Sequence, residues 1–209
     1  MIPFCLLTLL LSGCWDYTEL NERNIVTAVA VDEGEELPWL LTVEYVSFEG
    51  GSFTGRVISA EGTTLPACEE GLVRQLGRYP YWNQAKVLLL SEPLIKEGGY
   101  TGVMDWMVAG NRFSLGILTA LVEGSGAGEL LRGNQGKDPQ GMVLSNMLDD
   151  QVAFGRIPPC PLYLLYNASS TGSRPARLPR LMQTGDEEEK AVELLGSLTL
   201  SQGEISLSP

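Results

Sequence analysis

The sequence predicts a mixed α/β (α+β) fold with a sheet flanked by helices, and three observations lead to this class. β-Branched and apolar runs typical of buried strands alternate with segments whose apolar residues recur at helical spacing. Glycine and proline separate most of these segments. The hydrophobic fraction of 44% and the charged fraction of 19% are those of a globular chain that buries a core.

The chain is predicted to begin its sheet with a hairpin. Residues 25–31 form a β-branched run, residues 32–36 an acidic turn, and residues 40–48 a strand with two alternating faces. The glycines within residues 49–55 predict a flexible loop. A short strand is expected to follow at residues 56–60.

A helix is predicted over residues 65–76, with Thr64 as its cap and Gly77 at its exit. The helical spacing puts Cys68 on the buried face, and we expect Glu69 and Glu70 to face water. The apolar run of residues 86–91 predicts a strand that is covered on both faces.

The second half of the chain continues the alternation of helices and strands. Its predicted elements, in order, are a helical segment at 93–109 broken at 98–99, a strand at 115–122, a tight loop at 124–128, a short helix at 129–132, a helix that starts at Asp138-Pro139 and carries an apolar stripe over 142–148, one or two helical turns at 162–166, an acidic linker at 186–190 and a hairpin of 192–200 with 204–207.

Charge and composition exclude several function classes. The formal net charge is −12, so the surface repels nucleic acid and bare anionic lipid. Histidine is absent, which removes the commonest general base, metal ligand and partner of a nucleophile. The glycine-rich stretches 124–128 and 131–138 lack the spacing of a dinucleotide loop or a P-loop, and the acidic pairs lack that of a calcium loop. We therefore predict no enzyme activity, no metal and no cofactor.

The first residues predict a lipid anchor. An apolar run from Phe4 to Leu11 ends at Ser12-Gly13-Cys14, which is the pattern of a bacterial lipoprotein signal. We expect residues 1–13 to be removed and acyl chains on Cys14 to hold the protein to a membrane. The alternative is a buried strand or core helix, since the run is too short to span a bilayer. No Lys or Arg precedes Arg23, so we expect the natural start to lie upstream of Met1.

Two other features leave alternatives open. An exported location permits a disulfide between Cys68 and Cys160, whereas the helical position of Cys68 favours a free thiol in the core. Arg174, Arg177 and Arg180 lie in a stretch without acidic residues. They predict either a solvated loop, which we favour, or a contact with lipid phosphates or an acidic partner.

The segment Gly13-Cys14-Trp15-Asp16, followed by Glu19-Leu20-Asn21, resembles the opening of the Ger(x)C family, the C subunits of spore nutrient germinant receptors. The similarity continues in a first strand that ends at Asp32 and in the step Ser59-Ala60-Glu61-Gly62. It extends to the strand at 86–92 and to Leu178-Pro179-Arg180.

This resemblance implies the N-terminal domain of a multidomain lipoprotein in residues 14–185, after a signal peptide in residues 1–13. Residues 186–209 would then be the start of a truncated second domain. The implied function is a non-enzymatic, lipid-anchored receptor subunit in spore germination, on the outer face of the spore inner membrane. Its implied partners are the membrane and the receptor A and B subunits, with no nucleic acid, and the germinant is not identified. The alternative function is an exported solute-binding lipoprotein.

Overall fold

The strands that the structure describes join one mixed sheet. The computed structural model describes residues 24–49, 52–133, 138–171, 174–185, 190–201 and 204–208. In this part, nine strands form a sheet in the order β3-β2-β1-β5-β6-β7-β8-β9, and the short β4 pairs with the start of β1. The strands are β1 (Asn24–Glu33), β2 (Trp39–Glu49), β3 (Ser52–Gly62), β4 (Pro80–Tyr81), β5 (Val87–Ser91), β6 (Leu118–Glu123), β7 (Ala176–Thr184), β8 (Ala191–Ser201) and β9 (Glu204–Ser208).

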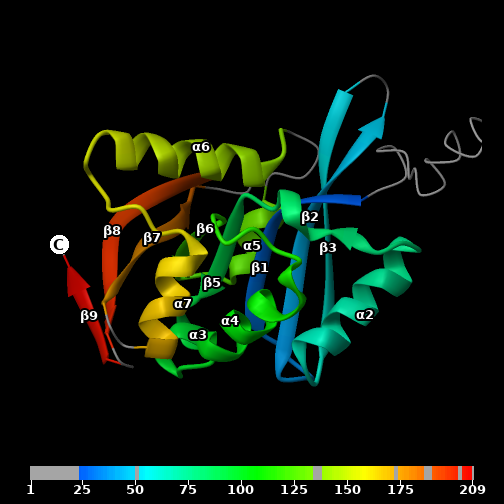
Figure 1. Ribbon diagram of the computed structural model, residues 1–209. Helices are drawn as coiled ribbons and strands as arrows, with labels where there is room; N and C mark the ends of the chain where they lie inside the picture. Colours follow the sequence, from blue (N-terminus) through cyan, green and yellow to red (C-terminus); the bar gives the residue numbers. More distant parts are fainter. Residues whose placement is uncertain are drawn as a thin grey trace, which may run out of the picture.

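Helices cover both faces of this sheet (Figure 1). They are α2 (Leu65–Leu76), α3 (Glu92–Lys96), α4 (Tyr100–Val108), α5 (Ala127–Arg132), α6 (Gln140–Ala153) and α7 (Leu162–Thr171), with the 3₁₀ turns η2 (Trp82–Gln84) and η3 (Ala109–Asn111). Side chains of α2, α4 and α7 join one core cluster, and those of α5 and α6 join the other. The predicted mixed α/β class is therefore confirmed.

The centre of the sheet is parallel and buried on both sides. β1, β5, β6 and β7 run in the same direction. Along β5, Leu88 and Leu90 enter the first core cluster, and Val87 and Leu89 enter the second. This alternation confirms the prediction of a strand covered on both faces, because a parallel strand between two helical layers needs apolar residues at every position.

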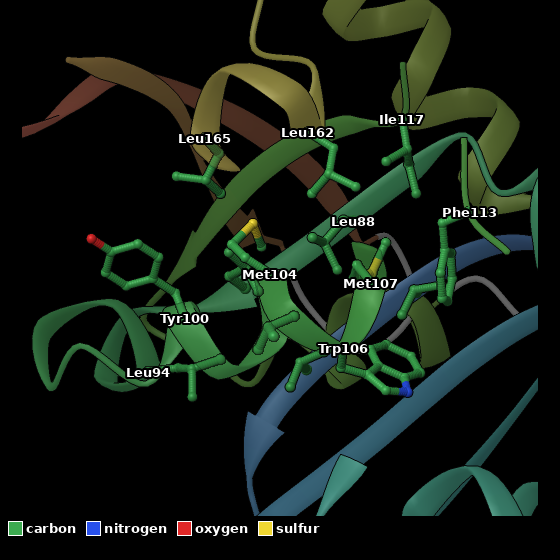
Figure 2. Packing of buried hydrophobic residues seen from close by; sticks show 14 of the residues in the cluster. Leu88, Leu94, Tyr100, Met104, Trp106, Met107, Phe113, Ile117, Leu162 and Leu165 are labelled. Carbon is green, nitrogen blue, oxygen red and sulfur yellow. The ribbon is translucent and has the colours of Figure 1, made fainter. Parts of the chain in front are cut away.

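The first core cluster is built around α4 (Figure 2). Met104 and Met107 of this helix are buried against Leu88 of β5 and against the apolar face of α7. Near the end of α4, Trp106 packs edge-on against Trp82 with their ring centroids 5.8 Å apart. Phe113 lies 5.0 Å from both indoles, so three aromatic rings close this end of the core.

Several predicted elements are confirmed close to their expected bounds. Thr64 accepts a hydrogen bond from the amide of Ala67 at 3.3 Å, and Gly77 ends α2 with a positive φ of 67°. The predicted helical segment at 93–109 is present as α3 and α4, separated at the glycine pair 98–99. The C-terminal hairpin is present as β8 and β9. Local signals were sufficient here because each cap or break lies within a turn of the helix that it ends.

Three predictions were wrong in length or type. The segment 49–55 is not a long loop, because β2 and β3 pair without interruption up to Glu49 and Ser52 and form a hairpin that projects beyond the sheet (Figure 1). The helical turns predicted at 162–166 extend to Thr171 as α7. The arginine-rich stretch is not a solvated loop, since Ala176–Thr184 forms β7 between β6 and β8. Pairing between distant strands overrode the local turn signals.

The C-terminal hairpin belongs to the same sheet as the rest of the described chain. β8 pairs with β7 from Ala176↔Leu200 to Thr184↔Ala191, and Leu198 and Leu200 are buried in the first core cluster. A domain division at residue 185 stays a prediction.

Candidate functional site

The predicted anchor residue Cys14 lies outside the described residues. Two other cysteines, Cys68 and Cys160, remain after the predicted cleavage. Both are free and buried. Burial raises the pKa of the Cys160 thiol to about 12, and its sulfur lies 3.0 Å from the Thr119 hydroxyl. Burial also raises the pKa of Cys68. Both are therefore core thiols, and the disulfide alternative is not realised in this structure.

The glycine-rich loop after β6 binds the side-chain carboxylate of Asp32. The side chain of Asp32 accepts hydrogen bonds from the amides of Ala127 and Gly128 at 2.6 and 2.9 Å, at the start of α5. A Cβ atom on Gly128 would lie 2.5 Å from the Thr42 hydroxyl, so this glycine serves close packing. The buried Asp32 occupies the helix amides that a bound phosphate would need.

A second buried carboxylate caps the longest helix. Glu44 of β2 accepts hydrogen bonds from the amides of Gln140 and Gly141 at 2.6 and 2.7 Å and from the Thr27 hydroxyl at 2.6 Å. Asp138, which the sequence suggests as the capping acid at the start of this helix, does not have this role, because the cap residue of α6 is Pro139, which has no side chain that can accept a hydrogen bond. The helix start is thus anchored to the sheet by a residue almost 100 positions earlier in the chain.

The Glu61 carboxylate holds the turn between β1 and β2. It accepts hydrogen bonds from the amides of Glu35, Glu36 and Leu37, each at 3.1 Å. The amide of Glu35, together with those of Glu36 and Leu37, lowers the pKa of Glu61. Asp32 and Glu61, two of the acidic residues in the segments that carry the resemblance, are therefore structural.

A groove of about 580 Å³ lies beside β4, at the aromatic end of the first core cluster. It is lined by Glu69, Tyr79, Pro80, Tyr81, Trp82, Asn83, Arg112, Phe113, Ser114 and Leu115. At its floor Glu69 accepts hydrogen bonds from Trp82 Nε1 at 3.2 Å and from the guanidinium of Arg112. The groove therefore combines aromatic walls with one partly buried ion pair.

The position of Glu69 corrects the prediction that it faces water. Glu69 is only 8% exposed, whereas Glu70 is exposed as expected. Glu69 lies four positions after Leu65 and three before Leu72, so it falls on the same face of α2 as these buried residues. That spacing was the signal in the sequence that could have identified it.

A second hollow, of about 680 Å³, lies where the parallel strands end. Its lining includes Asp32, Glu33, Glu92, Glu129 and Arg132. The hydroxyls of Ser91 and Ser125, which also line it, are buried and have no hydrogen-bond partner among the described residues. This hollow is acidic and could accept a hydrogen-bonding group at its two serines.

The basic stretch around β7 is divided between two environments. Arg180 donates two hydrogen bonds to the carboxylate of Glu123, at 2.5 and 2.9 Å, in a bidentate ion pair. This pairing raises the pKa of Arg180. Arg174, just before β7, and Arg177, near its start, are exposed. Arg180 is therefore not available for the external contact that the sequence left open.

Two further observations concern metals and membranes. Within the described ranges, no group of three or more His, Cys, Asp or Glu side chains is arranged to hold a metal ion. Among the helices that the structure describes, none is long and apolar enough to cross a membrane.

Comparisons with known proteins agree with one another. The family described as "Spore germination protein N-terminal domain" matches residues 16–181. "Spore germination protein KC" of Bacillus subtilis (strain 168) is 26% identical over 123 residues, which are 50% of this chain and 30% of that protein. "Putative spore germination protein YfkR" of the same organism is 27% identical over 104 residues, 44% of this chain and 27% of that protein. The matched segments thus span less than a third of either relative. No solved structure matches the chain significantly.

Proposed function

This chain belongs to the spore germination protein family whose N-terminal domain it matches over residues 16–181, and from that premise we propose that it is a lipid-anchored, non-enzymatic subunit of a spore nutrient germinant receptor. The family match carries the proposal, and the resemblance of residues 13–25 to receptor C subunits supports it. The proposed partners are the A and B subunits of the receptor, and the proposed location is the outer face of the spore inner membrane.

The proposed anchor is Cys14, which follows the apolar run and the small residues Ser12 and Gly13. A diacylglyceryl group on its thiol, with a fatty acid such as palmitate, would hold the domain at the membrane after residues 1–13 are removed. The buried state of Cys68 and Cys160 supports this choice, since neither thiol is accessible for modification without unfolding.

A non-enzymatic role is supported by the use of the ionisable residues. The buried carboxylates of Asp32, Glu44 and Glu69 are engaged by helix amides or by an ion pair. Acids that hold the fold together in this way are poorly suited to exchange protons with a substrate.

Metabolic labelling with a fatty acid tests the anchor. We expect label in the wild type and in Cys68→Ala, and none in Cys14→Ala. Label that persists in Cys14→Ala would refute the choice of residue. The receptor role is tested separately in spores, where deletion of the gene should slow nutrient-triggered germination and leave vegetative growth unchanged. Normal germination of the deletion strain would reject it.

A solute-binding lipoprotein is the second candidate, and the acidic hollow with the unpartnered Ser91 and Ser125 hydroxyls favours it. This function requires that a small nutrient raise the melting temperature of the domain, because a ligand that binds only the folded state stabilises it. A panel of small nutrients at millimolar concentration provides the test. An unchanged melting temperature across the panel would favour the assembly subunit.

A further inference from the structure

One surface of the domain is formed where the parallel strands begin. We define this amino-end surface by residues 24–28, 77–87, 112–118, 160–163 and 174–177, which contain or directly precede the starts of β1, β4, β5, β6, α7 and β7. These segments are adjacent in space because Ile25 pairs with Tyr81, Val87 pairs with Leu118, and Leu118 forms a β-bridge with Pro161. The aromatic groove opens on this surface.

Large apolar side chains protrude from the amino-end surface. Tyr79 is 78% exposed and Leu115 is 47% exposed, and both line the groove. Tyr163 is 46% exposed, and its amide donates a hydrogen bond to the carbonyl of Leu115 at 3.1 Å. These three side chains therefore border one continuous apolar region rather than being scattered singly.

The charge of the amino-end surface is opposite to that of the whole protein. The residues that define it include no Asp or Glu, although the chain has a net charge of −12. They include Arg78, Lys86, Arg174 and Arg177, which are exposed and have no ion pair within the described part of the chain. The fifth cation, Arg112, is neutralised by Glu69 of α2.

Seven acidic residues lie at the opposite end of the strands. Residues 31–39, 91–99, 122–126 and 181–185 form this carboxyl-end surface, and the only cation in these segments is Lys96. Their acids are Asp32, Glu33, Glu35, Glu36, Glu92, Glu97 and Glu123. β1 has ten residues, so the two surfaces are separated by about 30 Å at roughly 3.3 Å per residue. This separation exceeds the Debye length of about 8 Å at physiological ionic strength.

We infer that the amino-end surface lies against an anionic lipid bilayer and that the carboxyl-end surface points away from it. This inference rests on the proposed lipid anchor. Cys14 precedes Asn24 by ten residues, so the anchored segment joins the domain at the amino-end surface. Tyrosine is suited to the headgroup region, and exposed Arg and Lys are attracted to anionic lipid.

The orientation also explains how so acidic a protein is held close to anionic lipid. The seven acids of the carboxyl-end surface lie on the far side of the sheet, where salt screens their charge from the membrane. The near side presents uncompensated cations and apolar side chains. Within the basic stretch, Arg174 and Arg177 would face the membrane. Arg180 would not, because it is paired with Glu123.

The test uses the full lipidated chain in vesicles of phosphatidylglycerol and phosphatidylcholine. Single cysteines are introduced as Tyr79→Cys and Leu115→Cys, with Leu37→Cys as the matched control, because Leu37 is 38% exposed on the carboxyl-end surface. A fluorophore on each introduced thiol is quenched with brominated lipid. The buried Cys68 and Cys160 do not compete for the label.

We expect at least twofold stronger quenching at positions 79 and 115 than at position 37. We also expect Arg174→Gln with Arg177→Gln to reduce this contrast in anionic vesicles and to leave it unchanged in purely zwitterionic ones. Equal quenching at the three positions, in protein that floats with the vesicles, would overturn the orientation and leave the anchor intact. Quenching contrast that appears only after the other receptor subunits are added would also overturn it. Loss of flotation would instead reject the anchor itself.

Discussion

Replacing Asp32 by alanine should destabilise the domain strongly, although the residue lies at the end of a strand in an acidic turn. Its carboxylate accepts two hydrogen bonds from the start of α5, at 2.6 and 2.9 Å, and the residue is 6% exposed. Hydrogen bonds to a charged group contribute about 1.5–3 kcal/mol each, and the desolvation cost of the carboxylate offsets part of this. We expect the free energy of unfolding to fall by about 2–4 kcal/mol, because the substitution leaves two helix amides buried without an acceptor.

Urea unfolding followed by circular dichroism measures this change. With an m value of about 2 kcal/mol/M, a loss of 3 kcal/mol lowers the unfolding midpoint by roughly 1.5 M. Glu33→Ala is the matched control, since Glu33 is the next residue and is exposed. We expect its free energy of unfolding to stay within about 0.5 kcal/mol of the wild type. An Asp32→Ala variant as stable as the Glu33→Ala control would refute the capping role.

The pH dependence of the same difference gives a second check. Burial raises the pKa of Asp32 in the folded state, although the amides of Gly128 and Ala127 lower it. The folded protein therefore binds the Asp32 proton more tightly than the unfolded chain does. The stabilising effect of Asp32 is fully present below the unfolded pKa and declines as pH rises through the folded pKa. We expect the difference in unfolding free energy between wild type and Asp32→Ala to be larger at acid pH. A difference that increases with pH would contradict this direction.

Three further predictions concern other parts of the fold. Glu44→Ala should lower the free energy of unfolding by about 3–5 kcal/mol in the same urea assay, because it removes the acceptor of two buried α6 amides. Gly62→Ala should cost about 1–3 kcal/mol, because its Cβ would lie 2.7 Å from the Cys68 amide nitrogen, whereas Gly116→Ala, with only a hydroxyl at 3.6 Å, should be close to neutral. In protein with both Cys5→Ala and Cys14→Ala, Cys68 and Cys160 should not react with a thiol reagent at pH 8 until urea is added, and fast reaction of the native protein would contradict their burial.

Prediction from the sequence succeeded where a local pattern is sufficient to define an element. Helix α2 has its cap at Thr64 and its exit at Gly77, and both are within one turn of its ends. The apolar run of β5 indicated burial on both faces because a strand exposes alternate residues to opposite sides of the sheet. These signals need no knowledge of the rest of the chain.

Prediction failed where the partner of a residue is distant. Glu69 pairs with Arg112, 43 residues later, and no local pattern at either residue identifies the other. Asp32 and the amide of Ala127 are 95 residues apart, so an acidic turn and a glycine loop were assigned separately although they meet in space. The arginine-rich stretch was assigned by composition, whereas its pairing with β6 and β8 makes it a strand.

The sequence by itself determined the mixed α/β class, the order of most elements and the family, because apolar periodicity, capping residues and short motifs are local properties of a chain. Only the tertiary structure decided which carboxylates cap which helices, that Arg180 is paired while Arg174 and Arg177 are exposed, and that four exposed cations lie at the end of the parallel strands opposite Asp32, Glu33 and Glu92. The physical reason is that the parallel pairing of β1, β5, β6 and β7 brings the segments before all four strands to one end and the segments after them to the other. Residues far apart in the sequence thereby share one surface.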